Sequence, residues 1–367
     1  MILARVRTSC FVAISFIALL LLSEIALSYA RPPFYELDGL LGWRLRSNLN
    51  ISTTQKTLDG QEYKVLFQTN ADGLRTFGHS STAPIQILVL GDSFTADATA
   101  SNDQMWYSVL VKELSVLSDR PLEDFYVLAG GGGGYGTYQN VLLSERLSNK
   151  VNPTVFIHQF CNNDFVNAHY EWESEGNGRT QYMLRPYAGI GDDAPQYRPG
   201  LIAYAYRSVL GRSRIFNKIE DLIQTLQYRW YGDYSQQIAP EIQSRYEKES
   251  VALTRHLLTR LRSKYAKIPA LMVNCSGEQT GPNKLWSTLA KEAGFISITL
   301  PSDVMDAAKT RGEKDIFRID GAHFSEKGNR LYGAALAKAL LSDDSSPFMI
   351  SVNRPMPLKR GSRHDPA

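Results

Sequence analysis

Residues 86–95 constrain the fold of this chain most strongly, because an apolar run there ends in Gly91, Asp92 and Ser93. The run has the composition of a buried strand in a parallel sheet, and Asp92 and Thr95 suit the start of a helix. A serine is a poor nucleophile unless it is held in the open beside a base. The end of a central strand can hold Ser93 in this way; the alternative interpretation is a simple N-cap of the following helix.

Strand and helix patterns alternate after residue 84, which predicts a parallel sheet with helices on both faces. Apolar runs predict strands at residues 85–90, 125–129, 155–160, 270–274 and 295–300. The spacing of apolar residues predicts helices at about 103–117, from about 137 onward and at about 326–341. We therefore expect one α/β domain over residues 84–342.

A β-rich segment at residues 34–83 precedes this domain. Residues 54–58 and 63–69 are expected to pair as a hairpin around Asp59-Gly60, a favoured two-residue turn. The sequence Asn-Ala-Asp-Gly-Leu-Arg at residues 70–75 predicts a turn-rich exit from the segment.

More than a hundred residues separate the third and fourth predicted strands, so we expect an insertion at 166–245. Its aromatic-rich first part, 166–212, leaves the carboxyl end of a strand, where ligands bind in such folds. We interpret it as a lid or substrate wall; aromatics that pack a small core of their own are the alternative. Amphipathic helices are expected around residues 215–226 and 246–261, and 343–367 has the composition of a disordered tail.

The N-terminus has the pattern of an export segment. Arg5 and Arg7 precede an apolar run at 11–22 that resumes after Glu24 and continues to Ala30. About 20 such residues roughly span a bilayer, and small residues near position 30 also suit a cleavage site. Residues 1–33 are thus a signal anchor or a signal peptide, and we expect the rest of the chain in the periplasm or at the cell surface.

Composition excludes several functions. A net charge of +3 is too small to indicate a nucleic-acid partner. Three cysteines without a CxxC pair, and six scattered histidines without HExxH spacing, indicate no metal site. We also expect no cofactor.

Asp320 and His323 supply the remaining groups that a nucleophilic serine needs. They share one turn before the last predicted helix, so the carboxylate can orient the imidazole and stabilise its charged form. Donors for an oxyanion are available from the Ser93 N–H, from a glycine N–H in 130–134 and from the Asn163 side chain. His158 and His256 lie in apolar patterns and are assigned to packing.

Four blocks of the sequence resemble those of the SGNH (GDSL-like) hydrolase family in identity and order: Gly-Asp-Ser-Phe-Thr at 91–95, Gly-Tyr-Gly-Thr at 134–137, Cys-Asn-Asn-Asp at 161–164 and Asp-Gly-Ala-His at 320–323. The resemblance implies a flavodoxin-like sheet. It implies Ser93 as nucleophile, His323 as base, Asp320 as its orienting acid, and Ser93, Gly134 and Asn163 as the oxyanion hole. Cys161 replaces a glycine of the third block, and the five-glycine run fits the second block in more than one register. The branch indicated is bacterial and extracytoplasmic.

Cys161 and Cys275 follow strands that would be neighbours in such a sheet. In an exported protein they could form a disulfide. Because such bridges need special geometry, we expect two separate buried thiols instead.

These features together predict a serine esterase that cleaves a carboxylic ester, with an acylated carbohydrate or lipid, such as an O-acetyl group on cell-surface carbohydrate, as the expected substrate. A polysaccharide O-acyltransferase would use the same three residues. A catalytically silent accessory protein is a second alternative. Gly131, Gly133 and Gly136 also fit the G-x-G-x-x-G pattern of dinucleotide-binding proteins, but they follow the second strand, and an exported protein would rarely meet the nucleotide.

Overall fold

A computed structural model of the chain describes residues 2–30, 34–79, 81–177, 184–189, 196–197, 213, 215–216, 219, 222, 238–276 and 281–342. The predicted tail at 343–367 lies outside these residues. So do most of the predicted helix at 215–226 and the central part of the predicted insertion.

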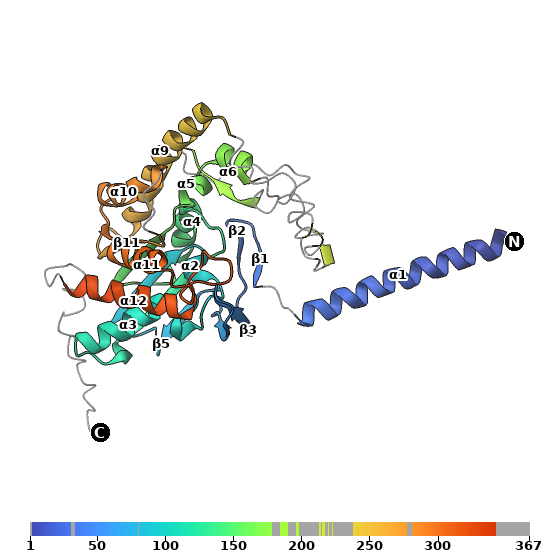
Figure 1. The fold of residues 1–367 in the computed structure, drawn as a ribbon, viewed down its shortest axis with the longest axis horizontal. Helices are drawn as coiled ribbons and strands as arrows, with labels where there is room; N and C mark the ends of the chain where they lie inside the picture. The colour runs from blue at the N-terminus through green and yellow to red at the C-terminus, as the bar shows by residue number, and fades with distance from the viewer. Residues whose placement is uncertain are drawn as a thin grey trace, which may run out of the picture.

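A six-stranded sheet in the order β12-β11-β8-β6-β7-β5 forms the centre of the fold (Figure 1). Five strands are parallel to one another: β6 (Ile85–Gly91), β7 (Phe125–Gly131), β8 (Val155–Phe160), β11 (Ala270–Asn274) and β12 (Ile296–Ile298). The sixth, β5 (Arg75–Gly78), is antiparallel to β7 and was not predicted. The predicted α/β class is confirmed, with β6 in the interior of the sheet.

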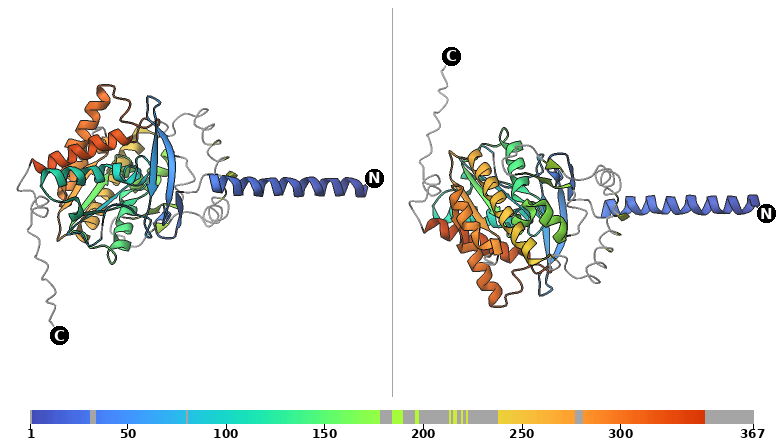
Figure 2. Two further views of the ribbon diagram at one scale, coloured as in Figure 1. Left: turned by 90° about the horizontal axis from the view of Figure 1, so that it is seen from below. Right: turned by 90° about the horizontal axis from the view of Figure 1, so that it is seen from above.

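Helices cover both faces of the sheet (Figures 1 and 2). One layer contains α3 (Trp106–Leu117), α11 (Leu300–Thr310) and α12 (Glu326–Leu341), and the other α4 (Thr137–Leu147), α9 (Pro240–Lys264) and α10 (Trp286–Glu292). Side chains of β6 alternate between the layers, as strand geometry requires: Ile87 and Val89 join the α3–α12 core, and Leu88 and Leu90 the α4–α9 core. Burial on both faces explains the uninterrupted apolar run.

Shorter elements complete the described chain. They are α2 (Ser93–Ala96), α5 (Asp164–Ala168), α6 (Tyr170–Asn177), β9 (Pro186–Tyr187), β10 (Gln196–Tyr197) and the 3-10 turns η1 (Asn102–Gln104), η2 (Leu122–Asp124) and η6 (Gly281–Leu285). The fifth predicted strand at 295–300 is partly wrong, because the chain enters α11 at Leu300, where Pro301 suits the first helical turn.

The segment before the sheet forms two hairpins, β1 (Tyr35–Asp38) with β2 (Gly42–Leu45) and β3 (Asn50–Lys56) with β4 (Glu62–Gln68). The predicted hairpin is confirmed, but its two-residue turn is wrong. Pairing ends at Lys56 with Glu62, and Leu58 N–H instead donates to Phe317 O at 2.9 Å. The tip of this hairpin is therefore paired with the segment that leads to Asp320.

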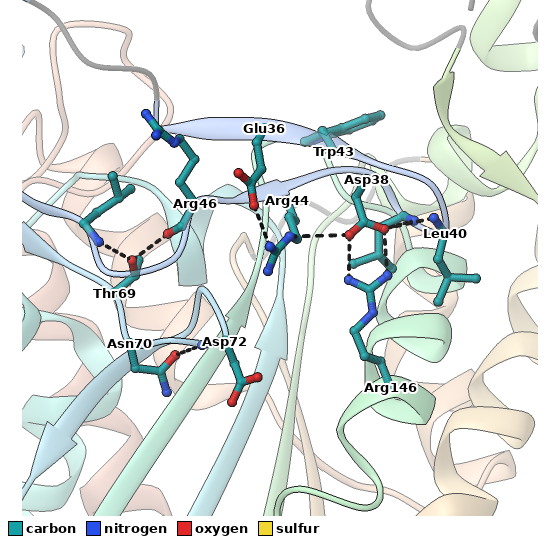
Figure 3. A network of polar contacts seen from close by, with 12 residues as sticks. Glu36, Asp38, Leu40, Trp43, Arg44, Arg46, Thr69, Asn70, Asp72 and Arg146 are labelled. Atoms are coloured by element: carbon teal, nitrogen blue, oxygen red, sulfur yellow. Dashed lines mark hydrogen bonds and ion pairs between the residues drawn. The ribbon is translucent and has the colours of Figure 1, made fainter. Parts of the chain in front are cut away.

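Charged groups fix the first hairpin to the α/β layers (Figure 3). Asp38 accepts two hydrogen bonds of 2.7 Å from the guanidinium of Arg146 on α4. Burial opposes the charge of Asp38, but the bonds from Arg146 and from two backbone N–H groups lower its pKa to about 2. At the end of the N-terminal segment, Arg75 of β5 is also buried and donates to Asp97 O and Ala100 O, each at 2.6 Å. The N-terminal segment is thus packed into the α/β layers.

The N-terminal residues form helix α1 (Ile2–Ala30), which extends away from the sheet (Figure 2). Within the described part of the chain, no helix combines the length and the apolar character that crossing a membrane would require.

Cys161 and Cys275 form a disulfide with their Cα atoms 5.2 Å apart, so the expectation of two separate thiols is wrong. The physical reason is the sheet register. β8 and β11 are paired parallel neighbours, and Cys275 N–H continues the pairing to Phe160 O at 3.0 Å. Residues just past both strand ends therefore lie side by side.

Removing this disulfide is expected to lower the free energy of unfolding by about 2–5 kcal/mol, because the bridge closes a long loop in the unfolded chain. The two cysteines are separated by 114 positions in the sequence. Urea denaturation of Cys161→Ala/Cys275→Ala against the parent chain measures the loss, with Cys10→Ala as the matched control. Free thiols at both positions in non-reduced protein would contradict the expectation.

Candidate active site

The end of β6 approaches its neighbours so closely that only glycine fits. A Cβ on Gly91 would lie 2.4 Å from Gln159 Oε1 and 2.5 Å from Thr95 Oγ1. Gly131, at the end of neighbouring β7, has φ +154°, and a Cβ there would lie 2.2 Å from Gly91 O. This packing fixes the turn from which Ser93 begins α2.

Two polar side chains hold this turn. Asp92 caps α2, its Oδ1 accepting the Phe94 N–H at 2.9 Å, and burial raises its pKa to about 6. Gln159 Oε1 accepts from the Thr95 hydroxyl at 2.8 Å and from Asp92 N–H at 3.3 Å. Gln159 was not predicted as a site residue, although it is a polar residue within a mostly apolar strand.

Ser93, His323 and Asp320 are in contact in the structure. Ser93 Oγ lies 2.8 Å from His323 Nε2, and His323 Nδ1 lies 3.1 Å from Asp320 Oδ2. Ser93 is 8% exposed, whereas the His323 and Asp320 side chains are 25% and 36% exposed. The hydroxyl is therefore mostly covered, and the imidazole and carboxylate lie at the surface.

The turn that carries Asp320 and His323 is braced by its own backbone. Asp320 Oδ1 accepts N–H bonds from Ala322 at 3.0 Å and His323 at 2.9 Å. Arg318 N–H donates to His323 O at 2.8 Å, and its guanidinium lies 3.4 Å from Asp320 Oδ2. These bonds hold the carboxylate against the ring before any substrate arrives.

The charges around His323 favour its protonated form. Burial alone would lower the pKa of the imidazole, but the hydrogen bond to Asp320 and the negative charges of Asp97, Asp320 and Asp92 outweigh it, so the pKa is raised above its usual value. Although burial acts to raise it, the pKa of Asp320 is held well below its usual range by the bonds from His323 and from the turn. Phe94 stacks on the imidazole with ring centroids 4.9 Å apart, a contact that the sequence analysis did not anticipate.

Gly134 and Asn163, the other predicted oxyanion donors, follow the ends of β7 and β8. Gly134 has φ +71°, and its carbonyl accepts from Asn167 Nδ2 at 3.2 Å. Asn163 is exposed at the start of α5, and its side chain does not cap that helix. Asp164 fixes this turn by accepting from Cys161 N–H at 2.7 Å and from the Thr137 hydroxyl at 3.1 Å.

The remaining histidines in the described chain lie apart from this site. His158 is buried in β8, where burial lowers its pKa to about 4 and keeps the ring neutral. His169 Nε2 contacts Glu249 at 2.9 Å. In the part of the chain that the structure describes, no group of histidine, cysteine and acidic residues is arranged to hold a metal ion.

A serine at the end of a parallel strand, in contact with a histidine and an aspartate, is the arrangement of a serine hydrolase. The family model described as GDSL-like lipase/acylhydrolase matches residues 87–336. The chain belongs to this family, and ester hydrolysis is the reaction class that the family supports.

Among the solved structures to which the chain is similar are three esterases, each at low sequence identity. An acetyl xylan esterase, AlAXEase, is 14% identical, with 70% of this chain and 100% of that chain covered and a TM-score of 0.37. A family 3 carbohydrate esterase from Clostridium thermocellum is 12% identical, with 70% and 96% covered and a TM-score of 0.37. The esterase EstA from a Pseudoalteromonas species is 11% identical, with 70% and 97% covered and a TM-score of 0.37. No curated protein matches the chain.

Proposed function

We propose that the chain hydrolyses a carboxylic ester through Ser93, His323 and Asp320. The observation that carries the proposal is the unbroken contact from Ser93 Oγ to His323 Nε2 at 2.8 Å and from His323 Nδ1 to Asp320 at 3.1 Å. Neutral His323 would accept the serine proton while the carboxylate holds the ring in the required tautomer.

The proposed reaction has two steps, acylation of Ser93 and hydrolysis of the acyl-enzyme. Ser93 Oγ attacks the carbonyl carbon as its proton passes to His323 Nε2, and the tetrahedral oxyanion collapses to an acyl-enzyme. The leaving alkoxide takes the proton from His323 and departs as the alcohol. Water then attacks the acyl carbon, gives its proton to His323, and the carboxylic acid is released as the proton returns to Ser93.

Three donors are proposed for the oxyanion: the N–H groups of Ser93 and Gly134 and the side-chain amide of Asn163. Within the described residues none of the three has an acceptor of its own. A donor without a partner is available to a charge that exists only in the transition state.

Asn163→Ala is expected to lower kcat by about 10²–10³-fold with little change in KM, because the amide would contact the oxyanion and not the ground-state ester. Steady-state kinetics with para-nitrophenyl acetate measures both constants. Asn162→Ala, one residue earlier in the same turn, is the neighbouring comparison. A larger kcat loss in Asn162→Ala than in Asn163→Ala would contradict the assignment.

Hydrolysis of an acylated carbohydrate and acyl transfer to a carbohydrate are distinguished by the fate of the acyl group. Acetylated oligosaccharides and short acyl esters are incubated with and without an unacetylated oligosaccharide acceptor, and free acetate and acetylated acceptor are quantified. Hydrolysis predicts acetate release that the acceptor does not reduce. Acetyl transfer that outpaces acetate release would establish the transferase. If Ser93→Ala still formed both products as the parent chain does, the proposed chemistry would be overturned.

Export from the cytoplasm is proposed with the same reaction. The basic and apolar N-terminus supports it, as does the disulfide, because disulfides persist in oxidising compartments. Cell fractionation with N-terminal sequencing tests it: a cytoplasmic chain with reduced cysteines would refute export, and the presence or absence of residues 1–30 separates an anchor from a cleaved signal.

A further inference from the structure

The first hairpin, β1–β2, lies outside the region matched by the family model, which begins at residue 87. It nevertheless reaches the glycine run at 130–134, where an oxyanion donor is proposed. Two of its side chains, Tyr35 and Trp43, bind the backbone on either side of the Gly133 Cα, at a sequence distance of 90 residues or more.

Gly133 is held at both of its polar atoms. Its N–H donates to the Tyr35 hydroxyl at 2.7 Å, and its carbonyl accepts the indole N–H of Trp43 at 3.1 Å. These two atoms belong to successive peptide groups: the Gly133 N–H lies in the peptide that joins Gly132 to Gly133, and the Gly133 carbonyl in the peptide that joins Gly133 to Gly134. Trp43 therefore holds the planar group that also carries the Gly134 N–H, and Tyr35 holds the group before it. The neighbouring Gly134, at φ +71°, accepts a bond from Asn167 at its carbonyl, and among the described residues its N–H has no acceptor.

The Tyr35 hydroxyl also connects this loop to the serine turn. It donates to Asp97 Oδ1, and Asp97 N–H in turn donates to Ser93 O at 2.9 Å. Burial, reinforced by the nearby Asp97 charge, raises the pKa of Tyr35 well above its usual value, so the phenol keeps its proton at neutral pH. One hydroxyl therefore links the glycine loop to the helix that begins at Ser93.

The hairpin itself is firmly seated. Asp38 at the end of β1 is bound by Arg146 of α4, the helix that follows the glycine run (Figure 3). Trp43 also lies against the guanidinium of Arg185, 5.2 Å from the ring centroid, and Arg185 forms a buried ion pair with Glu173. Tyr35 and Trp43 thus project from a support that is fixed on two sides.

We propose that Tyr35 and Trp43 are positioning residues that fix the two peptide groups flanking Gly133 and so aim the Gly134 N–H at the oxyanion. The proposal rests on the proposed esterase function and assigns part of its machinery to the N-terminal segment. It also selects one register for the five-glycine run: Gly133 N–H is occupied by Tyr35, so Gly134 is the donor. The Gly133 N–H is already bonded to the Tyr35 hydroxyl, beside the Asp97 carboxylate. This bond likewise disfavours binding of a dinucleotide phosphate at the glycine run.

Tyr35→Phe and Trp43→Phe test the proposal, because each removes one hydrogen-bonding group and leaves an aromatic ring at the position. Each is expected to lower kcat for para-nitrophenyl acetate by about tenfold or more, approaching the ~10²–10³-fold loss of an oxyanion donor, with KM changed by less than about twofold. The rate of inactivation by a fluorophosphonate should fall in parallel, because the phosphoryl oxygen uses the same donors.

Tyr63→Phe is the matched control. Tyr63 lies in the same N-terminal segment, and its hydroxyl donates to Thr99 O at 2.9 Å, away from the glycine run. It is expected to lose comparable thermal stability but to keep kcat. A Tyr35→Phe kcat equal to that of the parent chain, or a kcat loss matched by Tyr63→Phe, would overturn the proposal. If Ser93→Ala were as active as the parent chain, the esterase function itself would fail instead.

Discussion

Ser93→Ala is expected to reduce kcat for para-nitrophenyl acetate on the order of 10⁶-fold, and His323→Ala by a similar factor. The double variant should be no worse than either single variant. A nucleophile and its base act as one unit, so losing either removes the covalent pathway. The structure joins the two directly, with Ser93 Oγ 2.8 Å from His323 Nε2.

Ser148→Ala is the control for this experiment. Ser148 is an exposed serine whose hydroxyl donates to Glu145 O at 2.8 Å, and its removal should leave kcat unchanged. Rate losses that add up in the double variant would mean that Ser93 and His323 act separately, which would contradict the shared mechanism.

Asp320→Asn is expected to lower kcat by about 10³–10⁴-fold and to move the acid limb of the pH profile to lower pH. In the proposed mechanism catalysis needs neutral His323, so kcat/KM is expected to fall as pH drops through the imidazole pKa. In the parent chain that pKa is raised: burial lowers it, but the Asp320 hydrogen bond and the charges of Asp97, Asp320 and Asp92 outweigh burial. Removing the Asp320 charge lowers the pKa, and the limb must follow it downward.

The pH dependence of kcat/KM measures both effects. Asp315→Asn is the matched control, because Asp315 is an aspartate of the same region that pairs with Lys327 at 2.5 Å and not with His323. It should leave the limb in place. An Asp320→Asn limb at the same pH as in the parent chain would show that Asp320 does not set the protonation of His323.

Local sequence was sufficient to predict elements whose apolar pattern is regular and clearly bounded. β8, β11 and α12 lie at the predicted residues, since their apolar patterns are bounded by clear turn or cap residues such as Ser325. β5 could not be predicted in the same way. It has four residues and exists because Arg75 to Gly78 pair with β7, about 50 positions away in the sequence, and because the Arg75 side chain is buried against the chain after α2.

The same distinction applies to the site. Ser93, Asp320 and His323, which the structure places in contact, could be chosen as candidates because short blocks of sequence carry them. Their supporting contacts could not, because each joins distant positions: Gln159 to the Asp92 turn, Phe94 to the imidazole, and Tyr35 to Gly133 across 98 residues. The disulfide was missed for a related reason, since it depends on the register of β8 against β11.

The most direct test of the central claim is covalent labelling of the purified chain with a fluorophosphonate, followed by intact mass measurement and peptide mapping. We predict a single phosphonyl adduct on Ser93, which forms slowly in His323→Ala and is absent in Ser93→Ala. An unlabelled chain that still turns over ester, or an adduct on a different residue accompanied by loss of activity, would contradict it.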